Sequence, residues 1–406
     1  MYLILAWRNI WRNKRRSIIT ILSITFAVFL ACVMRSMQLG SYERMIENAA
    51  RFYTGYIQIH KNGFWADKML DNSFINDHEL IKTIASTKGV EVAVPRLESF
   101  ALASFGTKTK GSIVMGIDPE KEDLLTKVKS KVVDGQYIEA SDRSVMVAEG
   151  LAKYLNLKVG DSIVLIGQGY HGANAAAIYA IKGIMKFALP LQNNQTVYLP
   201  LKEAQWFYAA EERLTSIALV VDEAKNVDGI VAEISTQVDL AEMEVMGWRA
   251  MMPDLVQGIE VDNISGKIML WILYAVIGFG MFGTFLMMTA ERMYEFGVMM
   301  SIGMRRLVMQ SIIALEMAMM SFIGVLSGVG ISLPILIYYY NNPVFFSGES
   351  AEAIEKFGVE AAYFFSLEPS LFYNQAWAIF FMAFILGFYP IYVIHRLRPV
   401  EAMREA

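Results

Sequence analysis

Four long stretches of the chain are almost free of charged residues, and they limit its fold more than any other feature. The first, at 17–34, has 18 consecutive uncharged residues; as an α-helix these extend roughly 27 Å and cross most of a bilayer core. The chain is 55% hydrophobic and 19% charged, whereas an average soluble protein is about 25% charged. We therefore expect a membrane protein with four transmembrane helices, at 17–38 (including the start of a stalk), 266–290, 307–340 and 371–394.

Lysine and arginine flank these helices unevenly, which predicts their orientation because cytoplasmic loops carry an excess of positive charge. Basic residues lie before the first helix, between the second and third, and after the fourth: Arg8, Arg12, Lys14, Arg15, Arg16, Arg292, Arg305, Arg306, Arg396, Arg398 and Arg404. The loop at 341–370 has one lysine and five glutamates. Both termini and segment 291–306 are therefore predicted to be cytoplasmic, and 39–265 and 341–370 to lie on the far side of the membrane.

The two terminal segments are short and polar. Residues 1–16 are expected to form a cytoplasmic helix in the membrane interface. On such a helix one face is apolar and another is basic, with Leu3, Trp7, Ile10 and Trp11 on the first and Arg8, Arg12 and Arg15 on the second. Residues 395–406 are predicted to form a cytoplasmic tail.

The segment 39–265 reads as an α+β domain bounded by helical stalks, because strand-like and helical patterns follow each other without strict alternation. Strands are predicted at 56–60, 90–94, 112–115, 144–148, 162–166, 178–184, 196–199 and 216–221. Helices are predicted at 77–86, 149–154, 201–209 and 227–236. A further helical stretch near 253–267 is predicted to form a second stalk that packs on the first.

The composition argues against several functional classes. The motifs G-x-S-x-G and H-E-x-x-H are absent from the sequence, and no acids are paired in an acid/base arrangement. The single cysteine, Cys32, lies in an apolar run, and the four histidines are too far apart to share a metal ion. No basic face typical of nucleic-acid binding is present. We expect neither an enzyme nor a metal or nucleic-acid binder.

One loop of the large domain is unusual. The sequence GQGYHGANAAA at 167–177 is rich in glycine and alanine, with a tyrosine and a histidine at its middle. It is either a flexible hairpin tip or a contact loop for a cargo or partner. The candidate contact residues are Gly167, Gln168, Gly169, Tyr170, His171 and Gly172.

The cytoplasmic segment 291–306, ERMYEFGVMMSIGMRR, is too polar to span a membrane. Glu291 and Glu295 have the i, i+4 spacing of neighbours on a helix. Gly297 and Gly303 are poor helix formers, so each is expected to break or bend the chain. Methionine adapts to irregular grooves, and Met293, Val298, Met299 and Ile302 are expected to offer an apolar surface to a partner.

This segment also carries a resemblance to a known family. The pattern E-R-x-x-E-x-G-x-x-x-x-I-G looks like the coupling-helix signature of FtsX-like/MacB-type ABC transporter permeases. WRNIWRNKRRSIITILSITFAV at 7–28 is similar to the family's N-terminal segment. SVMVAEGLAKYLNLKVGDSIVL at 144–165 resembles its MacB-like periplasmic core domain, and RLRPVEAMRE at 396–405 resembles its C-terminus. One departure is a pair of methionines, at 299 and 300, where family members often carry an arginine.

The resemblance implies a non-catalytic permease subunit of a type VII, mechanotransmission ABC system in the bacterial inner membrane. Two permeases, identical or homologous, would work with two ATPase subunits that bind ATP and Mg²⁺. The sequence lacks the phosphate loop G-x-x-x-x-G-K-[ST], and only 16 residues precede the first span, so the ATPase is expected on a separate chain. The residues expected to couple to it are Glu291, Arg292, Glu295, Gly297, Met299, Met300, Ile302 and Gly303.

The cargo differs within this family, and several functions stay open. The favoured one is lipoprotein release to a periplasmic carrier, as in the LolC/LolE-like branch. The alternatives are MacB-like efflux with an adaptor, FtsX-like control of cell-wall hydrolases, a membrane-anchored structural protein and a membrane enzyme. Glu316 is the only acid deep in a span, and nothing in the sequence pairs with it.

A lipid anchor would need an apolar groove between spans. The run GFGMFG at 278–283 and the methionines after it are a candidate, through Met281, Phe282, Met287 and Met288. The same glycines are also typical of close helix packing, and the sequence leaves both interpretations open.

Overall fold

The computed structural model describes residues 2–12, 14–187, 189–222, 226–348 and 361–398. Parts of two predicted regions, the loop at 341–370 and the tail at 395–406, lie outside these residues, at 349–360 and 399–406. The chain divides into two compact units. The helical unit comprises Met1–Glu43, Ile259–Phe345 and Ala362–Ala406, and the α/β unit comprises Arg44–Gly258 and Phe346–Ala361.

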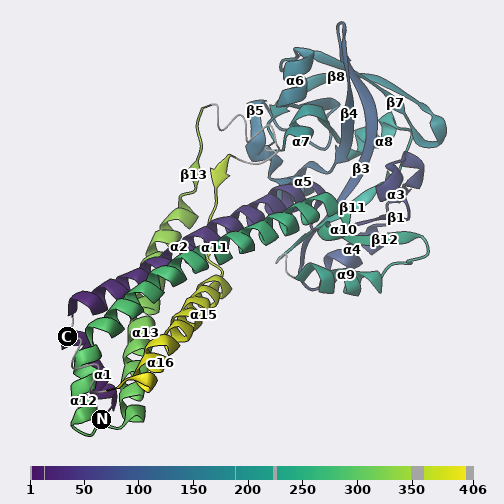
Figure 1. Cartoon of the computed structure of the whole chain (residues 1–406). Coiled ribbons are helices and arrows are strands. Elements are labelled where there is room, and N and C mark those ends of the chain that lie inside the picture. Colours follow the sequence, from purple (N-terminus) through teal and green to yellow (C-terminus); the bar gives the residue numbers. More distant parts are fainter. Residues whose placement is uncertain (1, 13, 188, 223–225, 349–360, 399–406) are drawn as a thin grey trace. The chain divides into compact units, whose positions relative to one another are not determined.

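Long apolar helices dominate the helical unit (Figure 1). Four helical segments in the described part of the chain are long and apolar enough to cross a membrane: Lys14–Ala50, Pro253–Glu291, Arg306–Asn341 and Pro369–Arg396. They match the four predicted spans and extend past them. The helices of this region are α1 (Tyr2–Arg12), α2 (Lys14–Ile46), α11 (Pro253–Glu291), α12 (Met293–Ser301), α13 (Arg306–Asn341), α15 (Pro369–Leu386) and α16 (Phe388–Arg396), and a short pair, β13 (Val344–Phe345) and β14 (Ala362–Tyr363), joins two connecting segments.

The fourth predicted span is broken, which the apolar pattern did not predict. The α15 helix ends before Gly387 and α16 begins after it. Pro390 lies in the first turn of α16 and has no N–H to donate to Leu386, so the helical ladder is interrupted there. Both pieces pack against α13.

Glycines bring α2 and α13 close together. A Cβ added at Gly324 would lie 2.7 Å from Cβ of Ile24, and one at Gly328 would lie 2.6 Å from Cβ of Val28. This is the small-xxx-small packing common between membrane helices. In the predicted run GFGMFG, by contrast, only Gly278 has a neighbour within 4 Å, so glycine-mediated packing lies mainly on another helix.

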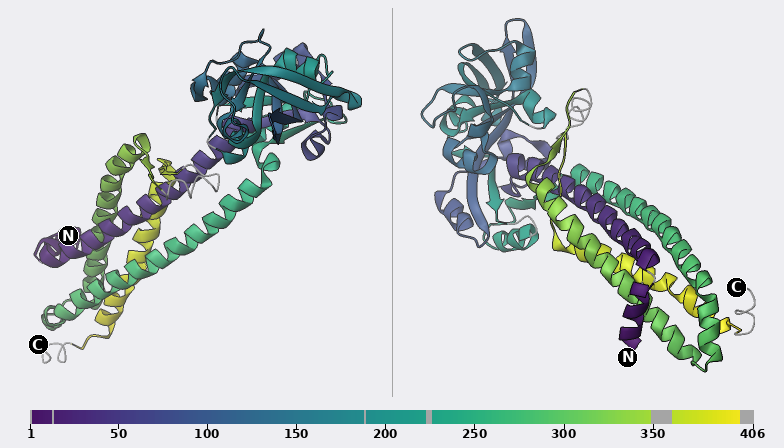
Figure 2. Two further views of the ribbon diagram at one scale, coloured as in Figure 1. Left: turned by 90° about the horizontal axis from the view of Figure 1, so that it is seen from above. Right: turned by 90° about the vertical axis from the view of Figure 1, so that its left-hand side faces the viewer.

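Polar side chains also join α2 and α11, which run side by side in Figures 1 and 2. Arg35 Nη1 donates to Asn263 Oδ1 over 2.9 Å, and the Tyr42 hydroxyl donates to Asp262 Oδ2 over 2.6 Å. Gln38 Nε2 donates to the Asp262 carbonyl over 3.1 Å. These bonds lie where the apolar runs end, and they hold the two helices in register.

The α/β unit contains one large sheet. Its strands are β1 (Ile57–Lys61), β3 (Val90–Phe105), β4 (Lys108–Ile117), β5 (Val132–Gly135), β6 (Ser144–Ala148), β7 (Ser162–Gln168), β8 (Asn174–Met185), β9 (Thr196–Pro200), β11 (Ser216–Val221) and β12 (Met243–Gly247), and β2 (Phe74–Ile75) pairs separately with β10 (Arg213–Leu214). The helices are α3 (Phe64–Asp67), α4 (His78–Ala85), α5 (Pro119–Thr126), α6 (Glu149–Leu155), α7 (Pro190–Gln195), α8 (Leu201–Phe207), α9 (Val227–Ser235) and α10 (Trp248–Met251). The eight predicted strands and four predicted helices of the 39–265 segment are all present.

Strand pairing gives the sheet two parts. The β3 strand pairs with both β4 and β7, and β8 pairs with both β6 and β7, so β3, β4, β9, β6, β8 and β7 form a closed ring. Three strands extend the sheet from β3 through β11 and β1 to β12, and β5 pairs with β8 on the ring. Each part has its own apolar core.

A buried ion pair fixes α5 to the sheet. Asp118 caps this helix by accepting from the N–H groups of Glu120 and Lys121, and Pro119 occupies its first turn. Glu122 then accepts from Arg96 of β3, at 2.9 Å from Nε and 2.6 Å from Nη2. Both side chains are almost fully buried. The sequence GIDPEKE at 116–122, which contains Asp118, Pro119 and Glu122, therefore has a structural role.

The buried His60 is expected to make the stability of the α/β unit depend on pH. Its buried ring lies in β1, 2.8 Å from Glu244 Oε1 of β12 and stacked on Trp65. Burial lowers the pKa of His60 below its ordinary value of 6.5, although the Glu244 carboxylate opposes this and Lys68 reinforces it. The unfolded chain therefore takes up the proton first. The free energy of unfolding should fall as the pH drops below 6.5 towards the lower folded pKa.

Denaturant unfolding of the purified chain at pH 5 and pH 7.5, followed by tryptophan fluorescence, checks this expectation. His60→Phe, which keeps a ring beside Trp65, should lose part of the pH dependence. An unchanged difference between the two pH values in the variant would show that other groups cause it.

Candidate functional site

Segment 291–306 forms a short helix between two long ones. Glu291 ends α11, and Arg292 lies in the turn before α12. Gly303 has a φ of 101°, and its N–H donates to the Met300 carbonyl over 3.1 Å. Only glycine adopts such a φ without strain, so Gly303 ends α12 and turns the chain towards α13.

Arg292 and Glu316 form a buried ion pair. Arg292 Nη1 lies 2.8 Å from each carboxylate oxygen of Glu316 in α13. Exposed fractions of the two side chains are 3% and 2%. The expectation that nothing pairs with Glu316 was therefore wrong, because its partner comes from the turn between α11 and α12. The pair connects these helices to α13.

Gly297 does not break the helix, contrary to the prediction. It is buried inside α12, which continues to Ser301. A single glycine costs a helix only about 1 kcal/mol. Packing of the adjacent Phe296 in the apolar cluster with Met309 and Ile313 offsets this cost.

The methionines of the segment pack inward. Met293, Met299 and Met300 are half-buried against the same apolar cluster, an environment that suits methionine better than arginine. Exposed apolar side chains are found instead at Ile302, which was among the predicted surface residues, and at Leu307. Their exposed fractions are 81% and 75%. We call Ile302 and Leu307, which flank Gly303 in sequence, the exposed apolar pair.

The two glutamates of the segment bind arginines from the N-terminal region. Glu295 pairs with Arg12 of α1, and Glu291 pairs with Arg16 of α2. All four side chains are partly exposed, and such pairs contribute at most about 1 kcal/mol each. No pattern in the sequence indicates these pairs, which join residues more than 270 positions apart.

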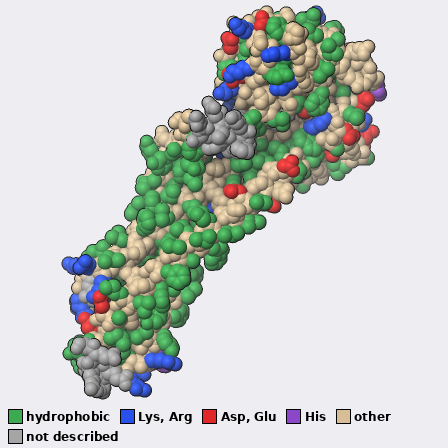
Figure 3. Space-filling model, turned by 45° about the horizontal axis from the view of Figure 1, so that its top comes forward, with side chains coloured by type: hydrophobic (Ala, Val, Ile, Leu, Met, Phe, Trp, Pro, Cys, Tyr) green, Lys and Arg blue, Asp and Glu red, His purple; other side chains and the backbone are tan. Residues whose placement is uncertain are grey.

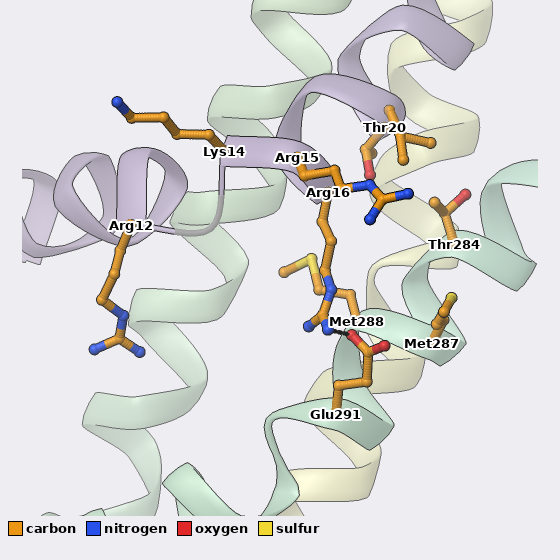
Figure 4. A pocket seen from close by; sticks show the side chains of 10 residues that line it. Arg12, Lys14, Arg15, Arg16, Thr20, Thr284, Met287, Met288 and Glu291 are labelled. Atoms are coloured by element: carbon orange, nitrogen blue, oxygen red, sulfur yellow. Dashed lines mark ion pairs between the residues drawn. The ribbon is translucent and has the colours of Figure 1, made fainter.

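A cavity of about 570 Å³ lies beside these pairs (Figure 4). Its lining is basic on one side and apolar or hydroxyl-bearing on the other: Arg12, Lys14, Arg15, Arg16, Ile19, Thr20, Thr284, Met287, Met288 and Glu291. We call it the basic pocket. Hydrophobic side chains cover the visible face of the helical unit in Figure 3, and Lys and Arg gather at its end.

The four residues of the predicted intramembrane groove do not share one site. Met281 is buried in the apolar core among the spans, and Phe282 packs edge-on against Tyr389 at 5.2 Å between ring centroids. Met287 and Met288 line the basic pocket instead. Met281 and Met288 are about two turns apart, so the rise of α11 separates them by roughly 10 Å along the helix axis.

The glycine-rich loop of the α/β unit is folded back on its own domain. Gly167 and Gln168 end β7, and Tyr170, His171 and Gly172 form a single turn before β8. The Tyr170 N–H donates to the Tyr208 carbonyl over 2.8 Å, and the Arg213 guanidinium lies 4.2 Å from the Tyr170 ring centroid. Gly169 lies so close to the Tyr208 carbonyl that a Cβ would collide with it. The residues of this loop that face solvent include Gln168, His171 and Gly172.

Comparison with known proteins agrees with the resemblance found in the sequence. Residues 17–237, more than half of the 406-residue chain, match the MacB-like periplasmic core domain. Residues 267–399 match the FtsX-like permease C-terminal region.

Individual relatives are distant. The lipoprotein-releasing system transmembrane protein LolC of Neisseria meningitidis serogroup B is 20% identical over 78% of this chain and 77% of LolC. The pyoverdine export ATP-binding/permease protein PvdT of Pseudomonas fluorescens is 23% identical over 98% of this chain and 58% of PvdT. The solved periplasmic region of MacB from Actinobacillus actinomycetemcomitans is 13% identical, covers 53% of this chain and 98% of that chain, and has a TM-score of 0.37. With both family matches in one chain, in this order, the protein belongs to the FtsX-like/MacB-type ABC transporter permeases.

Proposed function

We propose that the chain is a membrane subunit of an ABC transporter in the bacterial inner membrane. The pair of family matches, at 17–237 and 267–399, carries this proposal. The α/β unit, inserted between the first and second spans, is periplasmic, and both termini are cytoplasmic. The excess of lysine and arginine at 8–16 and 291–306 supports this orientation.

In this proposal, ATP and Mg²⁺ bind to partner chains and not to this one. Two separate ATPase subunits hydrolyse the nucleotide, a choice supported by the similarity to LolC, which is described as a transmembrane protein of its system. A second permease, either a copy of this chain or a homologue, completes the complex. This chain converts closure of the ATPases into a movement of its periplasmic domain.

Segment 291–306 is the contact for the ATPase. Ile302 and Leu307, the exposed apolar pair, provide the apolar surface that an interface core requires. The turn at Gly303 sets the position of Ile302, at the end of α12, relative to Leu307, in the first turn of α13. Arg292 does not reach the surface, so its role is to position the segment: its bond to Glu316 carries a displacement of α12 directly to α13.

The proposed cargo is a lipoprotein, which the complex would take from the inner membrane and pass to a periplasmic carrier. The similarity to LolC over 78% of this chain supports this choice. The similarity to PvdT over 98% of this chain supports an alternative, in which the complex exports another substrate through an adaptor. Exposed His171 and the turn around it remain the proposed partner contact of the α/β unit.

Co-purification tests the cargo. The complex, isolated in nanodiscs without ATP and analysed by mass spectrometry, should retain acylated lipoproteins that are released when ATP and a periplasmic extract are added. Retention of a small molecule and no lipoprotein would favour the export alternative. A catalytically inactive ATPase variant provides the control for release.

A further inference from the structure

We propose that the basic pocket binds the headgroup of an anionic phospholipid from the cytoplasmic leaflet. The inference rests on the proposed membrane orientation and goes beyond the transport function. Its ligand is a phosphate-bearing lipid, because one side of the pocket is cationic and the other is apolar. A volume of about 570 Å³ lies within the range of roughly 300–1,000 Å³ that small-molecule sites have.

Arg15 supplies a free positive charge to the pocket, and Lys14, which also lines it, lies over the Trp11 ring. Arg12 and Arg16 are each paired with a glutamate, whereas Arg15 forms no ion pair within the part of the chain that the structure describes. Figure 4 draws its guanidinium beside Thr20 and Thr284, away from the Arg16–Glu291 pair. The guanidinium fork matches a phosphate group. The α2 helix begins at Lys14, so the positive end of its dipole adds to the attraction for an anion.

Thr20 gives the second, independent indication of a ligand. Its side chain is 1% exposed and lines the pocket, yet its hydroxyl has no hydrogen-bond partner. Thr284, on the facing helix, donates to the Gly280 carbonyl within its own helix over 2.8 Å, as threonines in helices commonly do. A buried hydroxyl without a partner is costly, most of all near lipid. A phosphate or ester oxygen bound at Arg15 would accept a hydrogen bond from this hydroxyl.

The apolar lining distinguishes a lipid from a soluble anion. Ile19 and Met287 are about half or more exposed, at 47% and 62%, and they offer surface to the glycerol backbone and the acyl chains. Basic pockets between membrane helices on the cytoplasmic side commonly bind lipid headgroups. A bound phosphate would also compete with Glu291 for Arg16. Lipid binding would therefore weaken the ion pair of Glu291, the first residue of segment 291–306.

Native mass spectrometry of the purified chain in detergent tests the site with phosphatidylglycerol and phosphatidylcholine as probes. The chain should retain phosphatidylglycerol in preference to phosphatidylcholine. Arg15→Gln should lower the affinity for phosphatidylglycerol about fivefold, the typical effect of one basic residue near anionic lipid. Thr20→Val, which keeps the shape of the side chain, should lower it roughly tenfold, because it removes a hydrogen bond to a charged group.

Arg8→Gln is the matched control, since Arg8 is an exposed arginine of α1 outside the pocket. It should retain phosphatidylglycerol as the unchanged chain does. Equal losses in Arg8→Gln and Arg15→Gln would overturn the proposal, because they would indicate attraction to the general positive charge. Inorganic phosphate should not displace the lipid; if phosphate alone occupies the site, the ligand is a soluble anion and the lipid assignment is wrong. The measurement needs no ATPase, so its failure leaves the proposed transport function standing.

Discussion

Replacing Arg292 with methionine while Glu316 remains is expected to lower the free energy of unfolding of the helical unit by about 3–5 kcal/mol. The variant leaves a carboxylate that is 2% exposed without its partner. A buried charge without a partner costs far more than the loss of a surface ion pair. Thermal unfolding in detergent micelles, followed by intrinsic fluorescence, measures the effect.

The double variant Arg292→Met/Glu316→Leu separates the ion pair from the packing around it. Removing both charges leaves nothing unpaired, and buried pairs replaced by apolar residues of similar size are often close to neutral. The double variant should therefore recover most of the stability that Arg292→Met loses. If the double variant is as unstable as the single one, packing rather than charge explains the effect.

The same double variant probes coupling. In the proposed mechanism the pair transmits a displacement of α12 to α13. A stable double variant should bind the ATPase subunits and show weaker stimulation of ATP turnover by cargo.

The second large effect is expected at the exposed apolar pair. Ile302→Asp should weaken binding of the ATPase subunits by about thirtyfold or more, since hot-spot residues of an interface contribute about 2 kcal/mol or more. Ile302 is 81% exposed in the chain alone, so its replacement should leave the fold intact. Ser301→Asp, which adds the same charge at the neighbouring exposed position, should have a much smaller effect. Affinity is measured by titrating the ATPase against the permease in nanodiscs.

Gly303→Pro tests whether the turn between α12 and α13 orients the ATPase contact. Proline fixes φ near −65°, whereas Gly303 has a φ of 101° and donates its N–H to Met300. The variant should lose coupling because the turn would place Ile302 of the α12 end and Leu307 of α13 differently relative to each other. Full coupling in this variant would mean that the turn does not orient the contact.

Local patterns predicted much of this fold. The β6 and β11 strands have the predicted bounds, because alternating or continuous apolar residues between turn signals need no distant information. The four spans follow from length and hydropathy alone. The break at Gly387 was not predicted, although Pro390 three residues later was a local signal for it.

Contacts between residues that are distant in the sequence could not be predicted. Arg292 and Glu316 are separated by 24 positions and a tight turn, and Arg16 and Glu291 by most of the chain. Charge patterns give no register between helices that are distant in sequence. The closed ring of strands depends on β7 pairing with the second half of β3, from Ala101 to Ser104. For the same reason the methionines at 299 and 300 were expected outside, although the cluster around Met309 covers them.

The central claim is that segment 291–306 contacts a separate ATPase. Ile302→Cys, introduced into the chain whose single native cysteine is buried, can be labelled with a photoactivatable maleimide in native membranes and cross-linked. The account predicts a cross-link to a protein that carries a phosphate loop, and none from the control Ile178→Cys on the α/β unit, where the native side chain is 70% exposed. No ATPase cross-linked at position 302, or equal cross-linking from both positions, would contradict it.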